Sequence, residues 1–253
     1  MITVTEAQLM GWLGPLIWPF IRALALLTSL PVFSQRAVPM RVKVSLAFFI
    51  SLAAQASLPP MPEVALDSAA AVAMVLQQVL IGVALGFSVR LVFAAVELAG
   101  ELIGLQMGLN FAGFFDPATA SMGTASGKFF GTMVAFLFVI INGHLAILMV
   151  LARSFEAFPV GPEPFAFLWR TQPQTWGAEI FSLGLWIALP LVGMLLFVNL
   201  VLGVIARVAP QINVFAVGFP VTLGVGLIGM LLTLPLMQQP FTMALEGMMA
   251  RFQ

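Results

Sequence analysis

The sequence lacks cysteine and has few charged residues. Because none of its 253 residues is cysteine, disulfides, thiolate metal sites and a cysteine nucleophile are excluded. Charged residues make up 8% of the chain, ten basic and ten acidic, whereas a soluble domain averages about a quarter. A chain with so few charges cannot cover its own surface with polar groups, so lipid or a large partner interface must cover part of it.

The sequence also lacks the motifs that mark enzymes. Its single histidine, His144, lies in the sequence NGHL inside an apolar run, without a second type of metal ligand nearby. No glycine-rich phosphate loop, metalloprotease motif or nucleophile elbow occurs. No basic stretch indicates nucleic-acid binding. We therefore expect no enzyme activity, no metal, no cofactor and no nucleic-acid partner.

Long apolar runs dominate the rest of the chain, in which 61% of residues are hydrophobic and the mean hydropathy is +1.10. A helix that crosses a membrane needs about 20 apolar residues. The chain is therefore predicted to be an all-α membrane protein with about six long, partly kinked helices arranged as helical hairpins. Pro190 and Gly193 lie inside the fifth run, where proline removes an intrahelical hydrogen bond. The runs fall at roughly 9–30, 40–58, 69–96, 129–151, 180–206 and 212–237.

The connections between the runs differ in charge. Residues 31–43 carry three basic side chains, whereas residues 59–68 carry two acidic ones. The positive-inside rule places the basic connection on the cytoplasmic side and the N-terminus in the periplasm. Arg153 and Arg170 would then lie outside, against the rule.

A stretch rich in proline and tryptophan, residues 158–179, separates the fourth and fifth runs. Prolines break helices, and tryptophan prefers the level of the lipid headgroups, so we expect an interfacial or periplasmic connector. It divides the chain into an N-terminal part, 1–175, and a C-terminal helical pair, 176–253.

Charges inside or beside apolar runs are informative because each costs about 2.5–3.5 kcal/mol at the centre of a bilayer unless it is paired or hydrated. Arg22 lies in the first run, and Arg90, Glu97 and Glu101 lie in or after the third. Glu97 and Glu101 are four residues apart and repel on one helix face, so another group must offset them. An ordinary solvated helix end explains this spacing equally well.

Glycines recur at a four-residue spacing in the same region. Gly82 and Gly86 form one pair, and Gly100, Gly104 and Gly108 form a longer series. Small residues at this spacing let helix backbones approach closely inside a membrane. The series predicts a tight helix–helix or subunit contact, although glycine is common in membrane helices generally.

Residues 105–127 are not predicted to be helical, because several glycines and Pro117 interrupt them. The first half carries large apolar side chains, namely Met107, Leu109, Phe111, Phe114 and Phe115. Irregular backbone within a membrane protein must be buried in protein or line a cavity. The segment therefore suits a hydrophobic seal that closes a pore. From composition alone, a loop that dips phenylalanines into the headgroups is slightly favoured.

The motif ARVAPQINVFAVGFP, residues 206–220, lies between the last two runs. Arg207 ends one helix, where a cation complements the helix dipole. Pro210 starts a turn, and Gln211 and Asn213 offer side-chain amides to free backbone groups. A well-capped hairpin accounts for the spacing without any further function.

Four motifs in this order resemble the FliR family of flagellar export proteins, which is related to the T component of injectisome type III secretion. They are LPVFSQRAVPMRVKVSLA at 30–47, ELAGELIGLQMGLNFAGFFDP at 97–117, NGHLAIL at 142–148 and ARVAPQINVFAVGFP at 206–220. The resemblance covers essentially the whole chain, and the second and third blocks favour the flagellar branch.

The resemblance implies one subunit that joins five FliP and four FliQ subunits in a closed helical ring of the flagellar basal body. Further implied partners are FlhB, FlhA, exported unfolded flagellar proteins and membrane lipid. It implies a location in the bacterial inner membrane, with the assembly raised toward the periplasm. Residues 1–175 would be FliP-like, with the plug loop 105–127, and residues 176–253 would be a FliQ-like hairpin.

The resemblance also implies roles for individual residues. Met107, Leu109, Asn110, Phe111, Phe114, Phe115, Asp116 and Pro117 would form the pore plug. Gly100, Gly104, Gly108, Glu97, Glu101 and Arg90 would form helix-packing or subunit contacts, and Arg207, Pro210, Gln211 and Asn213 would shape a hairpin that meets FliQ and FlhB.

One alternative function remains at this stage. An ion-coupled secondary transporter would use Arg90, Glu97 and Glu101 near the middle of the membrane. Inverted repeats with paired broken helices would favour it, and the sequence shows none.

Overall fold

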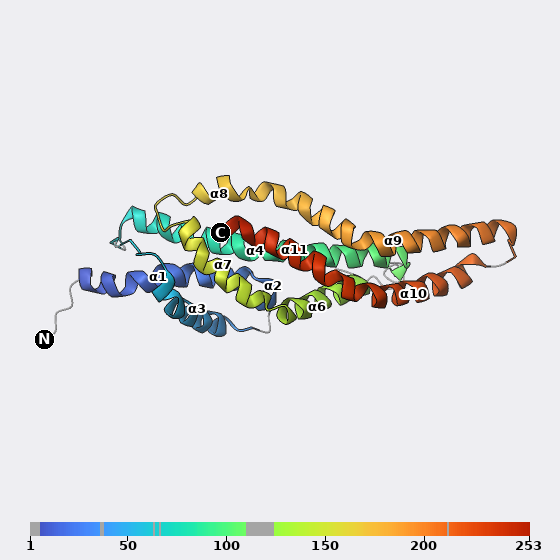
Figure 1. The fold of residues 1–253 in the computed structure, drawn as a ribbon, viewed down its shortest axis with the longest axis horizontal. Coiled ribbons are helices and arrows are strands. Elements are labelled where there is room, and N and C mark those ends of the chain that lie inside the picture. The colour runs from blue at the N-terminus through green and yellow to red at the C-terminus, as the bar shows by residue number, and fades with distance from the viewer. Residues whose placement is uncertain (1–5, 36–37, 63, 66, 110–123, 212) are drawn as a thin grey trace. The chain divides into compact units, whose positions relative to one another are not determined.

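The fold is described from a computed structural model that covers residues 6–35, 38–62, 64–65, 67–109, 124–211 and 213–253. Within these residues the chain forms α-helices and short 3-10 turns and no strand, which confirms an all-α protein (Figure 1). The helices are α1 (Glu6–Ser29), α2 (Pro31–Ser34), α3 (Met40–Ala54), α4 (Ala69–Gln106), α6 (Ala125–Ile140), α7 (Gly143–Ala157), α8 (Ala166–Thr171), α9 (Trp176–Val208), α10 (Val214–Thr233) and α11 (Gln238–Met249). The 3-10 turns are η1 (Gln55–Ser57), η3 (Pro173–Thr175), η4 (Leu234–Met237) and η5 (Ala250–Phe252).

Helices of membrane-crossing length are fewer than the predicted six. Three stretches in the described residues are long and apolar enough to cross, Ala69–Gln106, Pro173–Val208 and Ala216–Phe252, or up to four if α6 and α7 together count as one. The run 129–151 is broken because Asn142, between α6 and α7, takes a left-handed conformation with φ 57°. With 15 residues, α3 is about 22 Å long, shorter than a bilayer core of about 30 Å.

The helices group into two compact units that alternate along the chain. One unit holds Met1–Leu91, Asn142–Trp176 and Leu245–Gln253, and the other holds Val92–Ile141 and Gly177–Ala244. The sequence-derived parts 1–175 and 176–253 are consecutive instead, and their division into FliP-like and FliQ-like parts stays a prediction.

In the first unit, α3 folds back along α1 (Figure 1). The glycine pair of α4 brings that helix against α1: Gly82 lies on the backbone carbonyl of Arg22, and Gly86 lies on the carbonyl of Leu26 and the hydroxyl of Ser29. A methyl group at either glycine would collide with these atoms. The four-residue spacing thus corresponds to a close helix–helix contact within the chain.

Arg22 is fully buried in the first unit and joins three segments. Its Nε donates to Oε1 of Gln78 at 2.7 Å. One terminal nitrogen donates to the backbone oxygen and the hydroxyl of Ser154 at 2.8 and 2.9 Å, and the other donates to the backbone oxygen of Phe158 at 2.9 Å. The guanidinium also lies 3.7 Å from the ring centroid of Phe155. Neutral oxygens and an aromatic face therefore satisfy this buried cation.

Gln253 accepts hydrogen bonds from the two arginines whose predicted positions disagree with the positive-inside rule. Arg153 donates to Oε1 of Gln253 at 3.1 Å, and Arg170 donates to its backbone oxygen at 2.7 Å. Nearby, Trp176 is buried against Phe252, although a headgroup position was predicted for it. Trp169 is 86% exposed, and a headgroup position for it stays a prediction. Because both arginines make hydrogen bonds within the protein, they are poor indicators of which side of the membrane their segments occupy.

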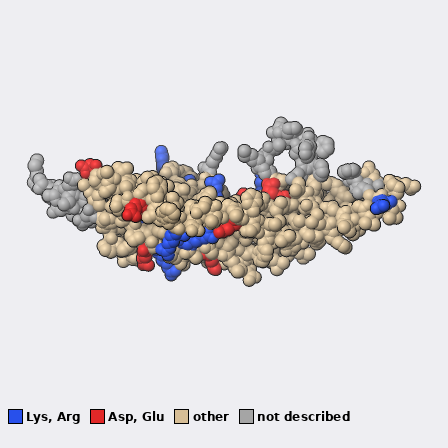
Figure 2. All heavy atoms as spheres, turned by 90° about the horizontal axis from the view of Figure 1, so that it is seen from above, with Lys and Arg blue, Asp and Glu red and all other residues tan. Residues whose placement is uncertain are grey.

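In the second unit, the helical hairpin of α9 and α10 leaves much apolar surface uncovered. Gly229 of α10 lies against Leu191 and Met194 of α9. We compared the buried share of the most apolar 18 residues in each long stretch. It is 17% in Pro173–Val208 and 22% in Ala216–Phe252, whereas it is 61% in α4. Figure 2 shows that charged side chains occupy only a small part of the visible face. Lipid or other subunits must cover the remaining apolar area.

Candidate functional site

The predicted plug lies between two helix ends that the structure describes. α4 ends at Gln106 and α6 begins at Ala125, close to the predicted limits 105 and 127. Six of the predicted plug residues, Asn110, Phe111, Phe114, Phe115, Asp116 and Pro117, lie outside the described residues. The geometry of the site is therefore that of its two fixed ends, 107–109 and 124–127.

Met107 anchors the first end in a notch of α10. The side chain is fully buried. A Cβ atom at Gly226 would lie 2.5 Å from Cγ and 2.6 Å from Sδ of Met107, so this side chain occupies the space that a larger residue would take. The hydroxyl of Thr222 lies 3.5 Å from the backbone oxygen of Met107, at the limit of a hydrogen bond. A flexible thioether suits such an irregular notch.

Gly108 ends α4. Its φ of 78° is left-handed, which glycine adopts without the steric cost of a side chain. Its N–H donates to the carbonyl of Leu105 at 3.1 Å, and that of Met107 donates to Ile103 at 3.0 Å. Gly108 therefore acts at a helix C-terminus, a common position for left-handed glycine, and Leu109 follows, half-buried.

Glu101 of α4 holds the second end. Its Oε1 accepts a hydrogen bond of 2.9 Å from the backbone N–H of Thr124. Thr124 caps α6, since its hydroxyl accepts from the N–H of Gly127 at 3.0 Å. The carboxylate thus lies at the N-terminus of α6, where the helix dipole favours negative charge.

The glycine and glutamate pairs belong to one interdigitated contact between α4 and α6. Phe130 and Ser126 of α6 lie on Gly100 and Gly104, and no Cβ would fit at either glycine without displacing them. In the opposite direction, the side chains of Glu97 and Glu101 lie on two glycines of α6, Gly131 and Gly127. Each pair has a four-residue spacing and the two series run in opposite directions, so the helices are antiparallel here. The contact is within the chain.

The other predicted residues are distributed along the helices. Arg90 is exposed on α4. Arg207 lies exposed in the last turn of α9, and Pro210 and Gln211 are exposed in the turn that follows. Asn213 immediately precedes α10, and its Oδ1 accepts from the N–H of Ala216 at 3.3 Å. In the described residues, no group of three or more histidine, aspartate or glutamate side chains could hold a metal ion.

Sequence reasoning missed the partners of the site rather than its own residues. Gly127 and Gly131 repeat the four-residue glycine spacing, so the pattern that marked Gly100 and Gly104 could have found them. Gly226 is not part of a four-residue glycine series, since the glycines around it are Gly218, Gly224 and Gly229. No local signal connects it with Met107.

Replacing Glu101 tests how firmly the second end is held. We expect Glu101→Leu to speed hydrogen exchange at the amides of Thr124 and Gly127 about tenfold, because a hydrogen bond to a charged group contributes about 1.5 kcal/mol. Glu101→Gln keeps an acceptor oxygen and is expected to change exchange much less. Exchange followed by mass spectrometry on the purified membrane protein measures both. Equal exchange in the wild type and Glu101→Leu would show that the contact does not hold this end.

Known proteins match the chain over nearly its full length. The profile of the family described as bacterial export proteins, family 1, matches residues 13–248. The flagellar biosynthetic protein FliR of Escherichia coli (strain K12) is 44% identical over 239 residues, which cover 93% of this chain and 90% of the relative. The FliR proteins of Aquifex aeolicus (strain VF5) and Bacillus subtilis (strain 168) are 35% and 32% identical, covering 87% and 83% of this chain and 85% and 82% of the relatives. The chain therefore belongs to the FliR family of bacterial export proteins.

Proposed function

We propose that this chain is a noncatalytic channel subunit of the flagellar protein export apparatus. It helps to form the closed entrance pore through which unfolded flagellar proteins leave the cell. The observation that carries the proposal is the apolar surface of α9 and α10, which this chain alone leaves largely uncovered. Membership of the FliR family supports the export role.

The partners that would cover this surface are five FliP and four FliQ subunits, by family resemblance, in the bacterial inner membrane. FlhB and FlhA would contact the same assembly, and residues 206–220 would shape the hairpin that meets FliQ and FlhB. Only part of the apolar surface would then face lipid. The assembly would project to the periplasmic side.

Residues 105–127 would seal the pore of this assembly. Support comes from the fixed ends, since Met107 is buried on α10 and Thr124 is hydrogen-bonded to Glu101. These two contacts fix the described residues on either side of a stretch that is rich in phenylalanine in the sequence. Hydrophobic side chains in a narrow pore exclude water and ions.

The alternative of an ion-coupled transporter has weaker support. Such a protein would leave Glu101 available to bind an ion, whereas its carboxylate accepts from Thr124 and packs on Gly127. Arg90, the third member of the suggested ion site, is exposed.

The seal is tested by replacing Phe111, Phe114 and Phe115 together with alanine. We expect cells that carry this variant to leak ions or small solutes, because three large apolar side chains no longer fill the pore. Uptake of a small fluorescent solute and loss of membrane potential measure the leak. Phe48→Ala with Phe49→Ala, at exposed positions of α3, is the matched control and is expected to stay tight.

Assembly must be measured in the same strains. Native mass measurement after gentle extraction is expected to recover the chain in a complex with FliP and FliQ. A tight pore in a correctly assembled triple variant would contradict the seal. Recovery of the wild-type chain as a monomer, even with its partners co-expressed, would contradict the subunit role itself.

A further inference from the structure

One amide interrupts the apolar surface of α9. Between Ser182 and Arg207 the sequence of α9 holds no charged residue, and its only polar side-chain groups are the indole N–H of Trp186 and the amide of Asn199. Asn199 lies eight residues before Arg207, which is about 12 Å along the helix. The nearest charge on its own helix is thus more than two turns away, and the amide lies among apolar residues.

The amide of Asn199 makes no hydrogen bond with the part of the chain that the structure describes, and its side chain is exposed. By contrast, both hydroxyls of α10 are satisfied, because Thr222 and Thr233 donate to the carbonyls of Gly218 and Gly229 in the same helix. An amide surrounded by hydrocarbon or by apolar side chains is costly unless it is hydrogen-bonded. Asn199 therefore needs a partner beyond these residues.

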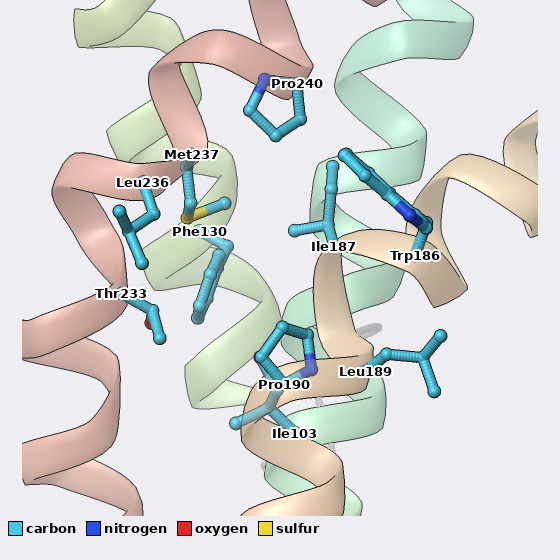
Figure 3. Close-up of a pocket in the computed structure, with 10 residues that line it drawn as sticks. All are labelled: Ile103, Phe130, Trp186, Ile187, Leu189, Pro190, Thr233, Leu236, Met237 and Pro240. Carbon is cyan, nitrogen blue, oxygen red and sulfur yellow. The ribbon is translucent and has the colours of Figure 1, made fainter.

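The pocket beside α9 does not supply that partner. Its volume is about 320 Å³, and Figure 3 shows Ile187 and Pro190 of α9 across from Phe130 of α6 and Met237. Its lining on α9 ends at Pro190, nine residues or about 14 Å before Asn199. Asn199 belongs instead to the later half of α9, in the hairpin that Figure 1 shows to extend past the end of α4.

The face of α9 that carries Asn199 is suited to another helix. Leu196 and Gly203 are three residues before and four residues after it, on the same side of the helix. Leu196 is 52% exposed, and no atom lies within 4 Å of the place where a Cβ of Gly203 would be. The missing side chain lets a second helix backbone approach closely beside the amide.

We propose that Asn199 forms an interhelical hydrogen bond with a neighbouring subunit of the assembly. The occupant of this face is an apolar helix that carries a neutral hydroxyl or amide side chain at the level of Asn199. A wholly apolar helix would leave the amide unpaired, and a charged one would find no opposite charge on residues 183–206. One polar pair within an apolar contact fixes the register of two helices. The inference rests on the proposed function, in which other subunits cover α9, and it adds the residue that positions one of them.

Photochemical crosslinking measures this register. A benzophenone amino acid is incorporated in place of Leu196 in the full chain, which is co-expressed with its partner subunits, illuminated in membranes and analysed by peptide mass spectrometry. We expect adducts within one helical turn of a hydroxyl or amide on one partner helix. In Asn199→Leu we expect the adducts to spread over two turns or more, about 11 Å. The yield at the original position should fall about threefold, the effect of an average interhelical hydrogen bond inside a membrane.

Two control variants separate the amide from the size of the side chain. Asn199→Gln keeps an amide, and Val204→Leu changes an apolar residue of the same helix that is 56% exposed. Both are expected to keep the adducts within the original turn. If Asn199→Leu does not assemble, the amount of recovered complex becomes the measurement, and we expect Asn199→Gln to restore it. Assembly of Asn199→Gln no better than that of Asn199→Leu would overturn the proposal.

Other occupants of this face give different results. Adducts at the original positions in Asn199→Leu would show that the amide does not set the register. Adducts confined to lipid or to the same chain would exclude a partner helix. Asn199→Cys is the only thiol in this chain, and its labelling by a membrane-impermeant reagent would place the residue in water. Each of these results overturns the hydrogen-bonded contact in an intact complex, whereas failure to recover the wild-type complex would contradict the proposed function itself.

Discussion

Arg22→Leu is expected to destabilise the chain by about 3 kcal/mol. The variant leaves three buried oxygens without this donor, namely Oε1 of Gln78, the hydroxyl oxygen of Ser154 and the backbone oxygen of Phe158. The backbone oxygen of Ser154 also loses Arg22 but still accepts from the N–H of Phe158 at 3.0 Å. Each buried acceptor left without a donor destabilises the fold by about 1–3 kcal/mol. Removing the arginine also removes the desolvation penalty of a buried cation that has no acid among these partners, so the net loss is smaller than the sum. Thermal unfolding of the protein in mild detergent, followed by circular dichroism, measures the loss.

Two further variants separate the shape of Arg22 from its charge. Arg22→Lys keeps the charge but places its donors on one nitrogen, which cannot reach all the acceptor oxygens on α4 and at the end of α7, so we expect an intermediate loss. Arg41→Leu removes the same charge from an exposed position of α3 and is expected to leave stability nearly unchanged. If Arg22→Leu unfolded at the wild-type temperature, the network would not hold α1, α4 and α7 together.

Arg22 also illustrates what the sequence could and could not predict. A cation within an apolar run stands out because of its desolvation cost, and this marked it from the sequence alone. Its partners lie 56 to 136 residues away and include two backbone carbonyls. No local pattern identifies a carbonyl as an acceptor, because every residue has one.

Helix positions followed from the apolar runs, whereas helix lengths did not. The run 129–151 is long enough in apolar residues to be predicted as one helix, although Asn142 and His144 interrupt it, and the left-handed Asn142 divides it. The runs also do not show which apolar faces are buried within the chain, because lipid, partner subunits and the protein interior all favour the same residues. The difference between the well-buried α4 and the exposed α9 appears only in the structure.

Residues 105–127 show the same difference between what local sequence predicts and what depends on contacts with distant residues. Glycine and proline content indicated irregular backbone, and the helix ends at Gln106 and Ala125 lie within two residues of the predicted limits. That Met107 is buried against Gly226, 119 residues later, depends on tertiary packing. The sequence therefore located the segment but not what holds its first end.

Gly226→Leu is expected to displace Met107 and to make the export channel leak. A Cβ atom at this position would lie 2.5 Å from Cγ of Met107, near the root of that side chain, so rotation of its tip alone cannot relieve the collision. The first end of the plug segment would then lose its contact with α10. Under the proposed function, we expect solute uptake to approach that of the triple phenylalanine variant.

The chain offers a close control two residues away. Gly224 lies on the same helix with open space where its Cβ would be, so Gly224→Leu adds the same side chain without a collision and is expected to stay tight. Met107→Ala in the Gly226→Leu background should restore part of the seal, because the added leucine can occupy the volume that the methionine vacates. If the Gly226→Leu and Gly224→Leu channels assembled and leaked equally, the leak would arise from the exposed face of α10, and Met107 would not anchor the segment.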